Sequence, residues 1–206
     1  MELIQTAEDR QRAIDILEMA LEQSPGMTWM IKPGRKNGFR NLLRHMYEVA
    51  RVHRGNYMTS DKSGVVLIYQ SSKKRRSVRL FFGKLKILFL VTGIRRGIQL
   101  AKVQRLIRQI RPNSGWHALL LASDERPGNA ATNELRREVF TLADSTNEPI
   151  YLETTRERMH RAYQWIGFKV YNQIKHPYED THIWFLRRDP FVGYKYDSKQ
   201  NEEAKK

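Results

Sequence analysis

The sequence predicts an α/β (α+β) fold in which a mixed β-sheet is flanked by helices. Two observations predict it. Strand and helix patterns alternate along much of the chain, which favours strands that share one sheet with helices packed on it. The last two predicted strands, 168–174 and 181–188, are joined by the short turn HPYED and therefore form an antiparallel hairpin. Strand–helix–strand connections and a hairpin in one sheet give strands of both directions.

The N-terminal part of the chain predicts two helices. Thr6 followed by Asp9 is a capping-box variant that opens a helix over 7–23, where apolar residues recur at helical spacing. The sequence Ser-Pro-Gly at 24–26 ends this helix. A second apolar face predicts another helix over about 36–54.

A hairpin and a strongly basic segment follow. Short β-prone stretches at 56–59 and 65–70 flank the turn DKSG at 61–64. Residues 73–111 then hold thirteen Lys or Arg and no Asp or Glu. Glycines interrupt the helical pattern of this basic segment, so we expect two helices with a bend between them, ended by Pro112.

The C-terminal part is more regular. HALLLA at 117–122 predicts a buried strand, and 133–144 predicts a helix. The next strand is expected at 149–154. A short helix over 156–166 follows it and ends at Gly167, because glycine readily adopts the left-handed conformation that closes a helix.

Composition sets limits on the kind of protein. A chain of 206 residues with 40% hydrophobic content suits one domain, which we expect over 1–194, followed by a disordered polar tail at 195–206. The absence of cysteine excludes disulfides, thiolate nucleophiles and Cys-based zinc sites, and the histidines show no metal-ligand spacing. The longest apolar run, at 87–94, is too short to span a bilayer, and no secretory signal is visible, so a cytoplasmic protein is expected.

The most specific part of the sequence is YLETTRERMHRAYQWIGF at 151–168, preceded by WHALLLA at 116–122. It combines a strand ending in Leu-Glu-Thr, a turn, a short helix with a tyrosine, and Gly-Phe. Over about 116–171 this order resembles the GNAT-type N-acetyltransferase superfamily, and the N-terminal half resembles it in element order. The resemblance implies a single GNAT-like domain with a strongly twisted, mixed central sheet. Residues 73–112 would then form a basic helical insertion between the third and fourth strands.

The resemblance also implies a cofactor, acetyl-coenzyme A (acetyl-CoA), held where the strands 117–122 and 149–154 diverge at their C-terminal ends. Its pantetheine arm would pair with the backbone of the first strand as an added strand does. Its pyrophosphate would lie at the N-terminus of the following helix, where unpaired amides and the helix dipole favour an anion. The cofactor-binding residues implied are Leu121, Ala122, Arg126, Gly128, Asn129, Ala130, Ala131, Thr132 and Arg156.

The phosphate-binding loop departs from the family pattern of Gln or Arg, two residues, Gly, one residue, and Gly or Ala. The nearest match begins at Glu125, which has the wrong charge. Counting back from the helix instead puts Pro127 first, and proline has no N–H to offer. The sequence therefore resembles a divergent member with a degenerate pyrophosphate loop, and an ordinary capped turn is the alternative.

Two catalytic residues follow from the resemblance, each beside a structural alternative. Tyr163 matches the family's tyrosine and would protonate the departing thiolate, or it packs in the core. Glu153 would serve as general base, or it pairs with a neighbouring arginine. His117 is a less favoured base, because a histidine there is more often a packed side chain. Trp29 and Met30 would shape the acceptor pocket or anchor its loop.

The function predicted is transfer of an acetyl group from acetyl-CoA to a primary amine of a small-molecule or protein acceptor. One alternative keeps the fold with weak or lost coenzyme A binding. The other, less favoured, is a basic protein that binds nucleic acid or a membrane surface. The net charge of +15 and the run KKRR at 73–76 near Phe81 and Phe82 would suit this alternative, whereas a solvated basic surface, or one that steers anions such as coenzyme A, would explain the same charge.

Overall fold

The computed structural model describes residues 1–22, 24–73, 77–124 and 130–191. The helices are α1 (Ala7–Leu21), α2 (Pro25–Thr28), α3 (Gly38–Val52), α4 (Val78–Ile87), α5 (Gly93–Ile110), α6 (Ala130–Thr146) and α7 (Glu157–Trp165). The strands are β1 (Glu2–Leu3), β2 (Asn56–Met58), β3 (Gly64–Gln70), β4 (Trp116–Ser123), β5 (Ile150–Thr154), β6 (Lys169–Lys175) and β7 (His182–Arg188). A 3₁₀ turn spans Ser71–Lys73, and a π-helical turn spans Leu88–Thr92.

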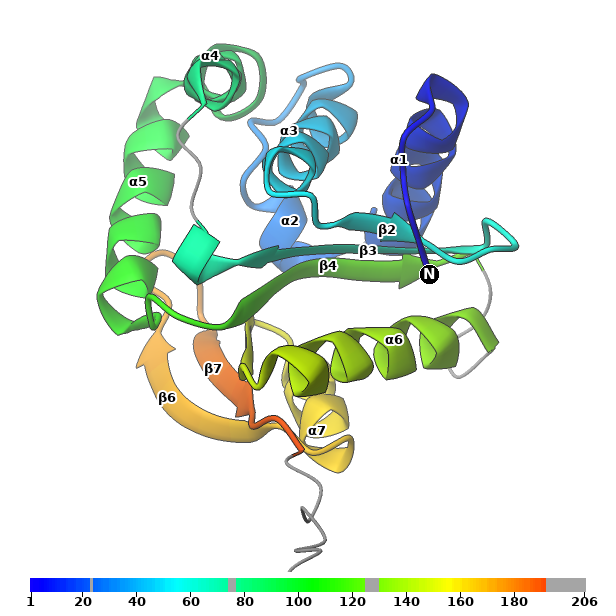
Figure 1. The fold of residues 1–206 in the computed structure, drawn as a ribbon. Helices are drawn as coiled ribbons and strands as arrows, with labels where there is room; N and C mark the ends of the chain where they lie inside the picture. The colour runs from blue at the N-terminus through cyan, green and yellow to red at the C-terminus, as the bar shows by residue number, and fades with distance from the viewer. Residues whose placement is uncertain (23, 74–76, 125–129, 192–206) are drawn as a thin grey trace, which may run out of the picture.

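The strands form one seven-stranded sheet in the order β1-β2-β3-β4-β5-β7-β6. β4 and β5 are parallel, and the other neighbouring strands are antiparallel, which confirms the predicted mixed sheet and the C-terminal hairpin. Figure 1 shows α1 and α3 on one side of the sheet and α6 on the other. The basic segment forms α4 and α5, between β3 and β4, as predicted.

The sheet is buried on both faces, and β3 illustrates why its sequence is apolar throughout. Val65 and Leu67 pack with the cluster under α1 and α3, whereas Val66 and Ile68 pack with the cluster under α6. Neighbouring residues of a strand point to opposite faces, so a strand between two helical layers needs apolar residues at every position. This explains the uninterrupted run VVLI.

The N-terminus of α1 is capped as the sequence predicts. The hydroxyl oxygen of Thr6 accepts a hydrogen bond of 3.0 Å from the backbone N–H of Asp9. Replacing the cap by Thr6→Ala should lower the free energy of unfolding by about 1 kcal/mol, measured by urea denaturation. Thr6→Ser keeps the oxygen and should stay close to the wild type. A serine variant as unstable as the alanine variant would contradict this explanation.

The predicted bend in the basic segment lies at the π-helical turn and Gly93. Gly93 has a φ of +69°, a conformation that L side chains rarely adopt. On α5, Val103 and Ile107 are buried against Ile183 and Phe185 of β7. The second helix of the basic segment therefore covers the C-terminal part of the sheet, and the first packs on α3.

The structure differs from the sequence predictions in a few elements. β1 was not predicted, because two residues are too few to show a pattern. Ser-Pro-Gly ends α1 but also begins the short helix α2. Gly167 has a φ of +97° after α7, as predicted. The expected tail at 195–206 lies outside the described residues, so it and the domain limit at 194 stay predictions. In the described parts of the chain, no helix has the length and apolar character needed to cross a bilayer.

Candidate active site

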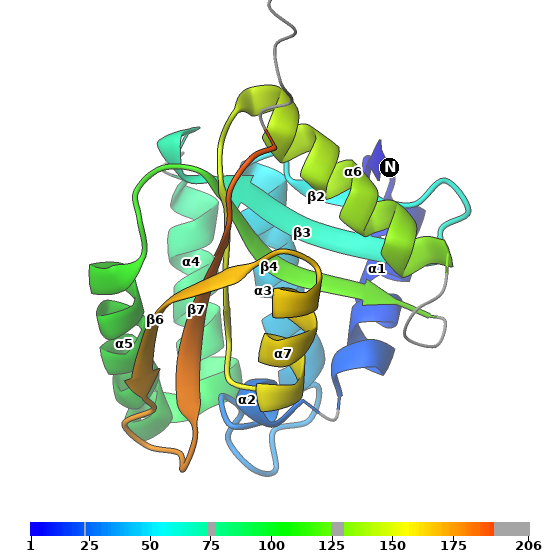
Figure 2. The same cartoon turned by 90° about the horizontal axis from the view of Figure 1, so that it is seen from below.

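The two central strands separate shortly after they meet. β4 pairs with β5 only at Trp116–Ile150 and His117–Tyr151, although both strands continue beyond these pairs. In Figure 2, β4 (green) and the yellow-green chain that leads into α7, which contains β5, run in different directions beyond the point where they meet. On its other side β4 stays paired with β3 as far as Ser123. The divergence implied by the family resemblance is therefore confirmed, and backbone groups of β4 beyond His117 face a side without a β5 ladder.

A β-bulge in β4 accompanies this separation. Leu67 of β3 pairs with Leu120 and Ile68 pairs with Ala118, which leaves Leu119 as an extra residue in β4. Leu119 and Leu120 both pack with the cluster under α1 and α3. A bulge bends its strand and increases the local twist, so it helps to turn β4 away from β5.

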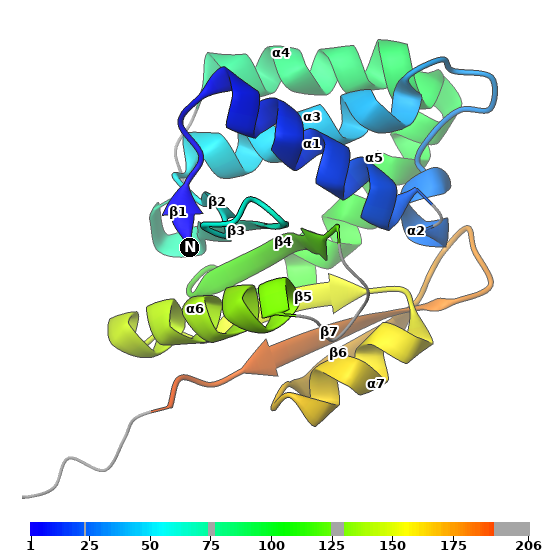
Figure 3. The ribbon, with the colours of Figure 1, turned by 90° about the vertical axis from the view of Figure 1, so that its right-hand side faces the viewer.

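The segment after β5 is held by elements that are distant in sequence. A Cβ atom added to Gly26 of α2 would lie only 2.7 Å from the Thr155 hydroxyl oxygen, so glycine allows α2 to approach. The Thr181 hydroxyl donates a hydrogen bond of 3.0 Å to the Thr155 carbonyl. Figure 3 shows α2 and the turn between β6 and β7 on the side toward which β4 and β5 point. Both therefore lie next to the C-terminal end of β5.

The start of α6 lies next to the end of β4. The hydroxyl groups of Ser123 and Thr132 share a hydrogen bond of 3.1 Å, and Ala131 is buried near Gly64 of β3. An N-terminal helix end favours an anion through its amides and its dipole. The predicted cofactor-binding residues Leu121, Ala122, Ala130, Ala131 and Thr132 are thus close together. Arg126, Gly128 and Asn129 lie outside the described residues, as do Glu125 and Pro127.

Tyr163 on α7 is half-buried, with its ring edge against Phe168 at 5.6 Å between ring centroids. Burial raises the pKa of its phenol, although the positive charge of Arg156 opposes the shift. The phenol therefore keeps its proton at neutral pH, as a proton donor must. Arg156 is exposed just before α7. The ring contact fits the core-packing alternative, and the catalytic role of the hydroxyl stays a prediction.

Glu153 forms a two-pronged ion pair with Arg111, the residue that follows α5. The Arg111 Nε and Nη2 atoms donate to the two carboxylate oxygens at 2.8 and 2.6 Å, and Nη1 donates to the Tyr69 hydroxyl at 2.9 Å. Both carboxylate oxygens are therefore engaged by one guanidinium. This geometry supports the structural alternative for Glu153, since a general base would first have to release Arg111.

His117, at the last paired position of β4, is buried between two aromatic rings. Its imidazole stacks on Tyr69 at 5.3 Å and on Tyr151 at 5.4 Å between ring centroids. The ring of Tyr171 packs edge-on against Tyr151, and burial raises the pKa of its phenol. These contacts agree with the packed-histidine alternative. Arg111 and Tyr171 were not predicted as part of the site, because nothing in their linear spacing connects them to β5.

A hollow of about 300 Å³ lies between α5 and the turn after β6. Arg96 donates hydrogen bonds to the carbonyls of Trp29, at 2.8 Å, and Ile31, so α5 fixes the loop after α2. The Trp29 ring stacks on Tyr178 with ring centroids 6.2 Å apart, whereas Met30 packs in the core under α1 and α3. Trp29 is thus a wall of the hollow and Met30 an anchor. The residues lining the hollow are Trp29, Arg95, Arg96, Gln99, Tyr178 and Glu179.

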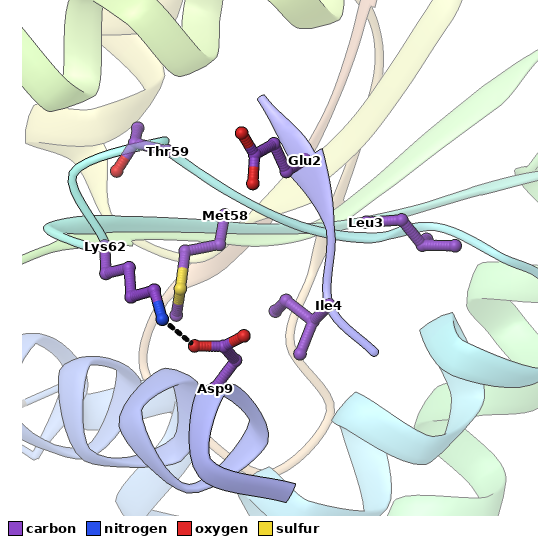
Figure 4. A pocket seen from close by; sticks show the side chains of 7 residues that line it. All are labelled: Glu2, Leu3, Ile4, Asp9, Met58, Thr59 and Lys62. Carbon is purple, nitrogen blue, oxygen red and sulfur yellow. Dashed lines mark ion pairs between the residues drawn. The ribbon is translucent and has the colours of Figure 1, made fainter. Parts of the chain in front are cut away.

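A second, much smaller cavity lies at the β1 edge of the sheet. Figure 4 shows it beside the ion pair of Lys62 and Asp9, whose charged atoms are 2.6 Å apart. Its volume of about 20 Å³ has room for little more than a water molecule. Among the described residues, no group of three or more His, Asp or Glu is arranged to hold a metal ion. The side of β4 that lacks a β5 ladder beyond His117 and the hollow beside Trp29 are the two places where we look for a ligand.

Comparison with known proteins gives matches in structure and not in sequence. The chain matches no family model, and no curated protein matches its sequence. Its fold is similar to a structure described as histone acetyltransferase HPA2 and related acetyltransferase from Corynebacterium glutamicum, with 19% identity, a TM-score of 0.62, and coverage of 92% of this chain and 96% of the other.

Two further structures have similar scores. Arylalkylamine N-acetyltransferase 2 from Aedes aegypti is 14% identical, with a TM-score of 0.60 and coverage of 92% of this chain and 98% of the other. The C-terminal condensation domain of Ebony, in complex with beta-alanyl-dopamine, is 14% identical, with a TM-score of 0.61 and coverage of 90% and 96%. Similarity at these identities describes the shared fold.

Proposed function

We propose that this chain, which has the fold of the GNAT-type acetyltransferases, transfers an acetyl group from acetyl-CoA to a primary amine. The observation that supports the proposal most directly is the short ladder between β4 and β5. Since neighbouring residues of a strand point their backbone groups to opposite sides, about half of those on 118–123 face the β5 side. An extended pantetheine arm can pair with such groups.

We assign each part of the donor to residues of this chain. When bound, acetyl-CoA would supply an activated acyl group and leave as a free thiol. Backbone N–H groups of β4 would donate hydrogen bonds to the acyl oxygen as it gains charge. The Tyr163 phenol would stay protonated and would donate its proton to the departing thiolate sulfur. The start of α6 and the side chain of Arg156 would bind the phosphates.

The hollow beside Trp29 is our proposed acceptor site. Trp29 and Tyr178, which stack on each other, offer aromatic surface, and Glu179 offers a negative charge for an ammonium group beside the positive charges of Arg95 and Arg96. Among proteins of this fold, one is named an arylalkylamine N-acetyltransferase and another an agmatine N-acetyltransferase, and both names contain an amine. Amines with an aromatic group, and without a second cationic group that Arg95 and Arg96 would repel, are therefore the acceptors to test first.

Acetyl-CoA should raise the melting temperature by about 5 °C or more once its concentration is a hundred times its Kd. Release of the thiol in the presence of a panel of amines would then report transfer. Ala130→Glu places a negative charge where the phosphates are expected and should weaken coenzyme A binding about tenfold. Ala101→Glu, the same change on an exposed part of α5, should not. If neither acyl thioesters nor coenzyme A stabilise the protein and no thiol is released, the proposal is wrong.

A further inference from the structure

The basic helices α4 and α5 present a large exposed apolar surface. Among the described residues, nine of the fourteen large apolar side chains that are exposed lie between 78 and 106. Scattered exposed apolar residues are normal, but a concentration of this kind marks a binding surface. The nine residues, which we call the outer apolar surface, are Val78, Phe81, Phe82, Leu85, Phe89, Leu90, Ile94, Ile98 and Leu106.

On α4 this surface is separate from the face that packs on the protein. At about 100° per residue, 78, 81, 82 and 85 lie on one side of α4, and 83 and 87 lie on the opposite side. Ile87 is buried, and a Cβ atom added to Gly83 would lie 2.7 Å from Nδ1 of His45 on α3. Figure 3 shows α4 along the outer side of α3, away from the sheet. The helix thus has one apolar face for the fold and a second that faces outward.

Cations flank the outward face. On the same helical projection Lys84 lies to one side of the stripe and Lys86 to the other, and both are exposed. Arg79, on the side of Lys86, is held by Glu48 at 2.9 Å. Lysine stems can lie along an apolar surface while the ammonium groups stay at a polar boundary. No acidic residue occurs anywhere in 73–111, so every formal charge that this segment itself contributes is positive.

This combination selects among partners. Phenylalanine and aliphatic side chains bordered by lysines suit the headgroup boundary of an anionic bilayer, where each exposed cation near the surface adds attraction. A two-fold interface with a second copy of the chain would bring the same cations toward each other. Nucleic acid would engage the cations and could stack on Phe81, Phe82 and Phe89, but the other six residues of the surface are aliphatic and give it nothing to stack on.

We infer that the outward face of α4, with Phe89 of the π-helical turn that follows it, docks on an anionic lipid surface. Val78, Phe81, Phe82, Leu85 and Phe89 enter the headgroup region, and Lys84 and Lys86 contact the anionic headgroups. This inference rests on the exposed side chains and their charge, and it is independent of the acyl transfer proposed above.

Sedimentation of the full chain with vesicles tests the inference. Vesicles of phosphatidylcholine with 30% phosphatidylserine should bind the protein, and vesicles of phosphatidylcholine alone should bind it at least tenfold more weakly. The double substitution Phe81→Ser and Phe82→Ser should weaken binding to the anionic vesicles at least tenfold, because it removes apolar area from the boundary. Lys84→Gln with Lys86→Gln should lower both the affinity and its salt dependence.

Matched variants separate docking from general effects. Met19 on α1 is 59% exposed, similar to Phe81 at 61% and Phe82 at 57%, so Met19→Ser should leave vesicle binding unchanged. Lys36→Gln removes one exposed charge outside α4 and α5 and should have little effect. Melting temperatures equal to the wild type would show that the variants fold. The inference is overturned if the wild type binds neither vesicle, or if the serine variant binds as the wild type does. It is also overturned if the wild type is a dimer that does not bind vesicles and the double serine variant is a monomer.

Discussion

Arg111→Met is expected to lower the free energy of unfolding by about 3 kcal/mol, measured by urea denaturation. The substitution leaves Glu153 as a buried carboxylate without its partner, since both of its oxygens accept hydrogen bonds from Arg111. The side chains of Arg111 and Glu153 are only 18% and 13% exposed, so water would replace the lost contact poorly. Burial alone would lower the pKa of Arg111, but its hydrogen bonds and the charge of Glu153 raise it, so the guanidinium stays charged.

A double variant provides the control. Arg111→Met combined with Glu153→Leu removes both charges and should recover most of the lost stability. Arg161→Met breaks an exposed pair, with side chains of Arg161 and Glu157 that are 70% and 63% exposed, and should change stability far less. If the losses of unfolding free energy of Arg111→Met and Glu153→Leu simply add in the double variant, the ion pair does not stabilise this region. Transfer activity in the stable double variant would also exclude Glu153 as the general base.

Tyr163→Phe is expected to reduce kcat for acetyl transfer about a hundredfold, because the departing sulfur would lose its proton donor. The KM for acetyl-CoA should change little. Stability should stay close to the wild type, since the ring contact with Phe168 is kept. Steady-state kinetics with the amine that the screen identifies would measure the effect.

The pH dependence gives a second measure of the same role. A raised pKa means that the folded protein keeps the Tyr163 proton at alkaline pH values where free tyrosine has begun to lose it. The wild-type kcat should therefore persist at those alkaline pH values and fall only when Tyr163 loses its proton. The pH profile of Tyr163→Phe should lack this alkaline fall. Tyr57→Phe, at another tyrosine whose pKa burial raises, should keep full activity. An unchanged kcat in Tyr163→Phe would leave core packing as the sole role of this residue.

Local patterns predicted most of the fold. Helical spacing with a cap at Thr6, and a glycine after α7, correspond to the observed ends of these helices. The bulge at Leu119 gave no signal, because three consecutive leucines show no alternation from which a residue count can be made. β1 and α2 are short elements whose existence depends on the strand or loop they contact.

The sequence predicted only those parts of the candidate site whose residues are close together in the chain. The resemblance over 116–171 implied the diverging strands, and their short ladder confirms this. Contacts between distant residues were not predictable in the same way. Arg111 and Glu153 are 42 positions apart, and Gly26 meets Thr155 from the other half of the chain. The roles of the residues at 125–129 stay predictions, since these residues lie outside the described parts.

The seven strands amount to two half-sheets joined by a hinge of only two residue pairs, Trp116–Ile150 and His117–Tyr151. The basic segment contacts both half-sheets and so connects them independently of these two residue pairs. α4 rests on the first half through α3, α5 packs on β7 in the second, and Arg111 ties Tyr69 of β3 to Glu153 of β5. We therefore expect the angle between the halves, and with it the space in which we propose that acetyl-CoA binds, to depend on a stretch of chain outside both.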